Sequence, residues 1–156
     1  METVTPPLGE RIRLPAAIGL GVGLIRFVLE FVAPGLSMYF GVYYVMPVVI
    51  AAIGLRGSWG PIRWPSLLLS MFVLCLIVWG IANSLSYTTA QFLEWHHGRF
   101  AEGRAAPIAA SALGKIGVGL LQGALTSLAG TAWCTVIGTL LIWLPARLRR
   151  KERAPM

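Results

Sequence analysis

The stretch GLIRFVLEFVAP, residues 23–34, decides how the chain folds, because it sets an arginine and a glutamate inside an apolar run. Residues 14–32 around it are long enough to cross a bilayer, whose hydrocarbon core needs about 20 helical residues. Arg26 and Glu30 are four positions apart and therefore share one face of such a helix. Near the centre of a bilayer each charge costs about 2.5–3.5 kcal/mol. We therefore expect this helix to turn both residues toward protein.

The composition extends the membrane reading to the whole chain. Of its 156 residues, 56% are hydrophobic and only 12% are charged, about half the 25% charge of an average soluble domain. The net charge of +7 does not indicate nucleic-acid binding, because five of the 13 cations crowd the tail and no nucleic-acid motif accompanies them. No aspartate and no nucleotide fingerprint is present in the sequence, and we expect no cofactor.

Apolar runs predict an all-α, integral membrane four-helix bundle in a single transmembrane domain. The spans cover residues 14–32, 37–55, 66–86 and 123–144, and a basic tail follows at 145–156, where Pro145 is expected to end the last helix. Residues 108–122 stay open as a fifth span, an interfacial helix or an extension of the last helix. No proline or glycine interrupts residues 84–97, so the third and fourth helices can extend beyond the bilayer.

The distribution of cations predicts the orientation. Nine lie on the side of the two termini and three, Arg99, Arg104 and Lys115, on the other side. The positive-inside rule then places both termini in the cytoplasm. Eleven of the 13 cations are arginine, a codon preference typical of a GC-rich bacterial genome, and we therefore expect the chain in a bacterial cytoplasmic membrane. Cations of the tail are expected to contact anionic lipid headgroups, and these are Arg147, Arg149, Arg150, Lys151 and Arg153.

Polar residues inside the spans fall near one depth when residues are counted at 1.5 Å each from the helix ends. The predicted intramembrane cluster comprises Arg26, Glu30, Tyr39, Tyr43, Asn83, Thr126 and Ser127. One interpretation is a self-neutralised pair that fixes the rotation of the first helix. Another is a buried site on a substrate, ion or proton path, which intramembrane ionisable residues often mark. A third is that the charged groups snorkel to the interface, because Glu30 lies only one turn before Pro34.

Small residues recur at a spacing that lets helices approach closely. Gly19 and Gly23 in the first span, and Gly119 and Gly123 before the fourth, are separated by four positions. Such pairs favour helix–helix packing where lipid supplies no hydrophobic drive. The contact can lie within one chain or between copies.

The connection EWHHGRFAEGR, residues 94–104, holds the densest polar chemistry. Glu94 and His97 share a helix face at i,i+3, the spacing that can offer two metal ligands. His96 points about 100° away, and a zinc site needs at least a third ligand. We interpret the segment as a solvated loop and assign no metal.

Three functional classes remain. The leading one is an accessory or structural membrane protein that packs against a membrane-protein partner or its own copy. The alternative is a small transporter, or a proton- or ion-coupled component, that uses Arg26 and Glu30. The third is a membrane enzyme that acts on a lipid-like substrate through Glu94, His96 and His97. The sequence favours a protein that is not an enzyme.

Overall fold

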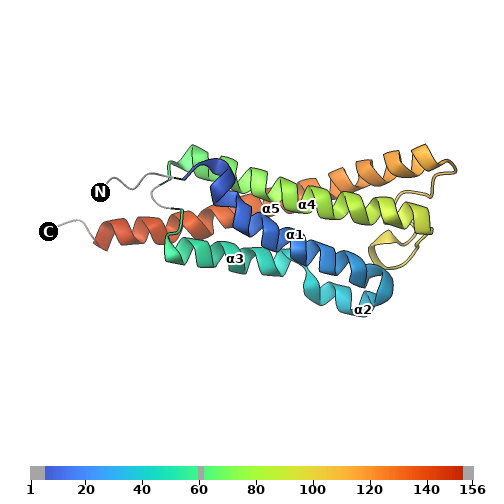
Figure 1. Ribbon diagram of the computed structural model, residues 1–156, viewed down its shortest axis with the longest axis horizontal. Helices are drawn as coiled ribbons and strands as arrows, with labels where there is room; N and C mark the ends of the chain where they lie inside the picture. Colours follow the sequence, from blue (N-terminus) through green and yellow to red (C-terminus); the bar gives the residue numbers. More distant parts are fainter. Residues whose placement is uncertain (1–5, 60–61, 153–156) are drawn as a thin grey trace.

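The computed structural model describes residues 6–59 and 62–152, with side chains up to residue 148. It confirms the all-α class: four helices are long and apolar enough to cross a membrane. Their order is α1 (Leu8–Val32), α2 (Pro34–Ser37), η1 (Met38–Phe40), α3 (Val42–Arg56), α4 (Trp64–Leu93), η2 (Gly98–Phe100) and α5 (Ala112–Glu152). The beginning of α1 and the end of α5 lie at the same end of the elongated bundle, called the terminal end below (Figure 1).

The third and fourth helices are longer than a bilayer requires. The 30 residues of α4 and the 41 of α5 span about 45 Å and 61 Å, against about 30 Å for a hydrocarbon core. Residues from Ala112 onward belong to α5, so the segment 108–122 is mainly an extension of the last helix rather than a fifth span. The connection from 94 to 111, called the cap below, folds back from the end of α4 toward the end of α1 (Figure 1).

The second span differs from the single helix expected over residues 37–55. The chain forms α2 and η1, passes through Gly41 in an extended conformation (φ −73°, ψ 127°), and only then begins α3. The 15 residues of α3 reach only about 22 Å. Pro34 at the start of α2 also prevents α1 from continuing. The second apolar run is therefore a discontinuous helix.

The last helix does not end at Pro145, as the sequence predicted, but continues to Glu152. A proline inside a helix leaves the carbonyl four residues earlier without its usual N–H donor. That carbonyl belongs to Leu141, and it faces Gly54 of α3 so closely that a Cβ at Gly54 would collide with it. Close packing against α3 thus accompanies the break in the backbone ladder, and the helix persists.

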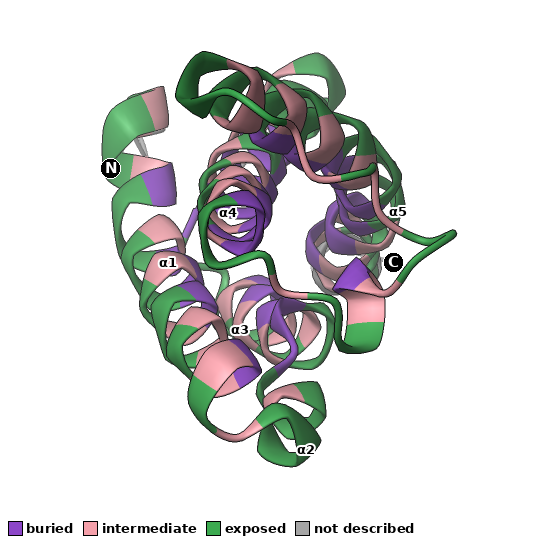
Figure 2. Ribbon diagram, turned by 90° about the vertical axis from the view of Figure 1, so that its right-hand side faces the viewer, coloured by how far each residue is buried: buried purple, intermediate pink, exposed green. Residues whose placement is uncertain are grey.

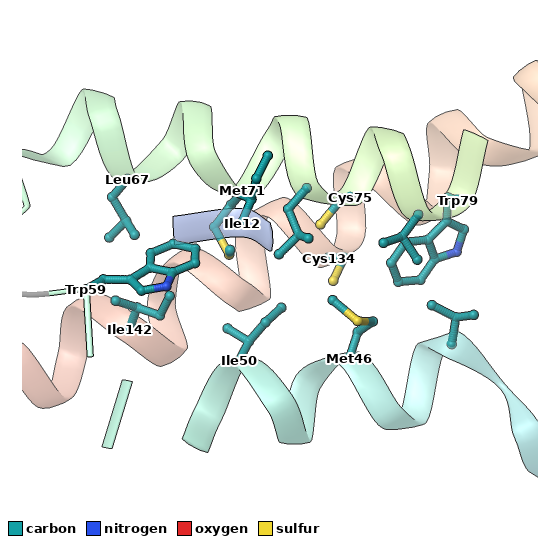
Figure 3. Packing of buried hydrophobic residues seen from close by; sticks show 13 residues of the cluster. Ile12, Met46, Ile50, Trp59, Leu67, Met71, Cys75, Trp79, Cys134 and Ile142 are labelled. Carbon is teal, nitrogen blue, oxygen red and sulfur yellow. The ribbon is translucent and has the colours of Figure 1, made fainter. Parts of the chain in front are cut away.

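The core lies where α3, α4 and α5 meet (Figure 3). Met46 and Ile50 of α3 face Met71 and Cys75 of α4, and all four are fully buried. Large apolar residues on the outward helix faces remain exposed, as lipid-facing positions require (Figure 2).

Glycines allow the closest helix approaches, and the structure places the four predicted ones on contacts within the chain. A Cβ at Gly119 or Gly123 would lie 2.5 Å from the Cα of Thr88 or Ser84 on α4. Gly19 of α1 packs against Met46 and Val78, and Gly23 packs against Ala82. These residues therefore serve intramolecular packing.

Candidate functional site: a charge cluster at the cap end

The cluster is built on Glu30, which lies in the last turn of α1. Its side chain is only 6% exposed. Arg26, one turn earlier, donates from Nε to Oε1 of Glu30 over 3.0 Å. The helical spacing alone positions this pair, because residues four apart lie on the same face. The pair that the sequence predicted is therefore formed in the structure.

A second arginine reaches Glu30 from the cap. Arg99 in η2 donates from Nη2 to Oε2 of Glu30 over 2.8 Å. Gly98 adopts a left-handed conformation (φ +62°) immediately before it, and this turn directs the chain back toward the bundle. Both carboxylate oxygens of Glu30 are thus occupied by guanidinium donors. Such charge-assisted bonds are about twice as strong as neutral ones.

The network continues through α4 into α5. Nη1 of Arg99 donates to Oδ1 of Asn83 over 2.8 Å, and Nδ2 of Asn83 donates to Oγ of Ser127 over 3.2 Å. The Ser127 hydroxyl lies 2.6 Å from the carbonyl oxygen of Gly123 and 2.9 Å from that of Trp79, and it can donate to either. We call Arg26, Glu30, Asn83, Arg99 and Ser127 the Glu30 cluster. It joins α1, α4, α5 and the cap.

Aromatic rings enclose the guanidinium of Arg99. Its Cζ lies 5.0 Å from the ring centroid of Tyr87 and 4.9 Å from that of Phe100, within the range of a cation–π interaction. Phe31 of α1 stacks on Phe100 at 6.0 Å and contacts Trp95 at 5.7 Å. The cap is therefore attached to α1 and α4 by apolar contacts as well as by charge.

The other three predicted cluster members lie elsewhere. Tyr39 in η1 is 72% exposed. The Tyr43 ring packs edge-on against Trp79, 5.1 Å between centroids. The hydroxyl of Thr126 is within bonding distance of carbonyls in its own helix. Counting depth along the spans correctly grouped Arg26, Glu30, Asn83 and Ser127, but it failed for Thr126 of α5 and for both tyrosines of the discontinuous second span.

Arg99 is the central residue that sequence reasoning missed, because it was placed in the solvated connection. No periodicity links a loop residue to a helix 69 positions away. The available signal was chemical: Arg99 directly precedes Phe100 and follows Trp95 by four positions, so apolar rings accompany the cation. Aromatic neighbours of this kind favour a stacked arginine over a free one.

The only two glutamines of the chain hold the middle of the cap in place. Nε2 of Gln91, which is buried, lies 3.4 and 3.3 Å from the carbonyl oxygens of Ala106 and Pro107, and its Oε1 accepts from the Ala109 N–H. Oε1 of Gln122 accepts from the Ala106 N–H. Extended backbone without a strand partner needs such acceptors and donors when it is partly buried. The cap is therefore an ordered structure.

The candidates of the outer loop do not converge on a catalytic arrangement. Oε1 of Glu94 accepts a hydrogen bond of 2.9 Å from the Lys115 ammonium, and this contact lowers the pKa of Glu94 below its usual value of 4.5. The His97 ring packs edge-on against Trp95. His96 lines a cavity of about 620 Å³ together with Glu94 and Glu102. Within the described residues, no group of three or more His, Cys, Asp or Glu side chains is placed to hold a metal.

The tail falls partly outside the described residues. Arg147 lies over the ring of Trp143, 4.8 Å from its centroid. The side chains of Arg149, Arg150 and Lys151 are not described, and Arg153 lies beyond the described chain. Their contact with anionic headgroups stays a prediction.

Chemically, the Glu30 cluster is a fixed electrostatic junction. Two guanidiniums pair with the Glu30 carboxylate, and hydrogen bonds from Arg99 to the Asn83 amide and from Asn83 to the Ser127 hydroxyl connect this pairing to α5. Comparison of the chain with protein-family models, curated proteins and solved structures finds no match. Four helices of the described chain are long and apolar enough to cross a membrane, and the function has to be argued from the cluster.

Proposed function

We propose that this protein is a non-enzymatic accessory component of a membrane, which holds an ordered cap on a four-helix bundle and packs against a partner membrane protein. The observation that carries the proposal is the double pairing of Glu30 by Arg26 and Arg99. The charged residues inside the spans are used to bind one another and to fasten the cap. A residue on a proton or substrate path needs instead an oxygen that is free to exchange partners.

The orientation belongs to the same proposal. Arg11, Arg13, Arg56 and Arg63 lie on the segments that meet at the terminal end, where the basic tail also emerges (Figure 1). The positive-inside rule favours a cytoplasmic location for this end, in a bacterial cytoplasmic membrane. The cap then faces the opposite side, where a partner's extramembrane part can contact it. A reporter fused after residue 156 that is active only outside the cytoplasm contradicts this orientation.

The test replaces the three charges by apolar groups of similar size. Buried ion triads can often be exchanged for well-packed hydrophobic residues without loss of stability, whereas removal of one partner is costly. If the cluster is structural, the triple variant Arg26→Met, Glu30→Leu, Arg99→Met accumulates in the membrane and complements a strain from which the gene has been deleted. It also migrates in the same native complex as the wild type. The single variant Glu30→Leu leaves two guanidiniums facing each other and fails in both assays.

The discontinuous second span favours a transporter as the second candidate function, since discontinuous helices near the bilayer midplane often form substrate or ion sites. Gly41 and the start of α3 lie in this span. If the protein is a transporter, the triple variant inserts into the membrane and accumulates, but it loses transport activity, and so does the single variant Glu30→Gln. Wild-type protein that migrates only as a monomer also argues against the accessory role.

A further inference from the structure

A second arginine site lies at the terminal end. Among the described residues, two buried donors of its arginine have no partner and none of its donors is paired with a carboxylate, whereas Arg99 of the Glu30 cluster bonds Glu30 and Asn83 and leaves only Nε unpartnered. Arg11 of α1 lines a cavity of about 310 Å³ between α1 and α3. Its Nε and Nη1 atoms are buried and make no hydrogen bond within the described chain. Buried guanidinium donors left without an acceptor are costly, and nearly all such groups in proteins are satisfied. Because both atoms are shielded from solvent in this conformation, an acceptor in the cavity reaches them only when the guanidinium turns toward it, and the geometry points to such an acceptor outside the described chain.

The cavity is amphipathic. Away from Arg11 its walls are apolar, formed by Leu14 and Ile18 of α1 and by Val49, Ala52 and Ile53 of α3. These residues lie in helices that are long and apolar enough to cross a membrane, so we expect this part of the cavity to be surrounded by hydrocarbon chains. A hydrocarbon tail matches these walls, whereas a fully polar ligand matches only the mouth.

The mouth of the cavity is polar and preorganised. Arg56 ends α3, and Gly57 follows in a left-handed conformation (φ 66°). The Ser58 N–H donates to the Ile53 carbonyl over 3.3 Å and the Gly57 N–H to the Gly54 carbonyl over 3.2 Å, the two bonds of a Schellman turn. This turn fixes the backbone of Arg56 and Ser58, which line the same cavity as Arg11.

Charge at the mouth defines the ligand further. Two arginines and Glu10 line it, which gives a formal charge of +1. No ion pair joins Glu10 to either arginine in the described residues, so both cations remain available. Guanidinium groups bind phosphate oxygens by two parallel hydrogen bonds. A single net negative charge complements this opening, and Glu10 disfavours a more highly charged ligand.

We propose that this cavity binds an anionic phospholipid, with its phosphodiester on Arg11 and Arg56 and one acyl chain between α1 and α3. Basic pockets between transmembrane helices at the cytoplasmic side are a known way to hold such headgroups. The site is separate from the basic tail, which attracts lipids through charge alone. It gives the protein a preference for one class of lipid at its terminal end.

Native mass spectrometry of the full chain in detergent tests the proposal, by titration with phosphatidylglycerol and with phosphatidylcholine of the same acyl chains. We expect the wild type to bind the anionic lipid at least tenfold more tightly, and Arg11→Gln to lose about tenfold of that affinity. Arg13→Gln is the matched control, because it removes the same charge from an exposed position of α1 outside the cavity. Arg56→Gln changes an exposed side chain at the mouth and gives a second reading if Arg11→Gln does not fold.

The tail and the headgroup are separated by filling the apolar part of the cavity. Ala52→Phe should weaken phosphatidylglycerol binding and leave any stabilisation by inorganic phosphate unchanged. Equal affinity for the two lipids overturns the proposal, and so does equal loss of binding in Arg11→Gln and Arg13→Gln. If inorganic phosphate stabilises the protein as strongly as the lipid does, and Ala52→Phe has no effect on lipid binding, the site binds a free anion instead.

Discussion

Arg99→Met is the sharpest test of how the cap is attached to the bundle. Methionine keeps an unbranched apolar stem between the rings of Tyr87 and Phe100, but it removes the guanidinium that bonds Glu30 and Asn83. Hydrogen bonds to charged groups contribute about 1.5–3 kcal/mol each. The Arg99 side chain is 25% exposed, so solvent screening reduces the sum. We expect the cap to open more easily by about 2–3 kcal/mol.

Hydrogen–deuterium exchange of residues 94–111 in lipid nanodiscs measures this change directly. Where reclosing is fast, exchange follows the equilibrium of local opening, so the expected change accelerates cap amides by about 30- to 160-fold. Arg104→Met is the control, because it removes the same charge from an exposed position of the cap. If the two variants exchange at the same rate, Arg99 does not fasten the cap. In a double-mutant cycle with Glu30→Gln, the two effects should fall short of additivity by about 0.5–3 kcal/mol.

Three further changes test other contacts. Gly123→Leu forces a side chain onto the Ser84 backbone; this overpacking costs about 1–3 kcal/mol or more of stability and should lower the melting temperature in detergent. The control Gly117→Leu places its side chain in open space and should leave the melting temperature unchanged. Gln91→Leu leaves the Ala109 N–H without its acceptor; cap proteolysis should become faster, at a cost of about 1–3 kcal/mol. Lys115 holds the pKa of Glu94 below 4.5, so this pair stabilises above that pH and the contribution is lost as pH falls through the lowered pKa. The difference in melting temperature between Glu94→Gln and the wild type should therefore disappear in acid.

The long helices could be predicted because the length of an apolar run is visible directly in the sequence. Apolar runs of sufficient length located α1, α4 and α5, and the i,i+4 spacing of Arg26 and Glu30 predicted their pairing. The break at Gly41 carries no such signal, since glycine is common in membrane helices and the surrounding residues are uniformly apolar. The continuation of α5 through Pro145 is accompanied by close packing of Leu141 against Gly54, and no local pattern contains this contact.

The arginines show most clearly why the candidate sites could not be predicted from the sequence alone. Arg99 has Trp95 and Phe100 close by in the sequence and Arg11 has no aromatic neighbour, but this difference does not say which residue each arginine contacts. In the folded chain, Arg99 finds Glu30 and Asn83, whereas two donors of Arg11 are buried with no acceptor. Desolvation makes both positions costly unless a partner is present. The chain satisfies Arg99 at Nη1 and Nη2 and leaves only its Nε without an acceptor, whereas the described residues supply no carboxylate to Arg11, which is why we propose a ligand with oxygen acceptors there. The apolar walls beside Arg11 then narrow that ligand to one with a hydrocarbon tail.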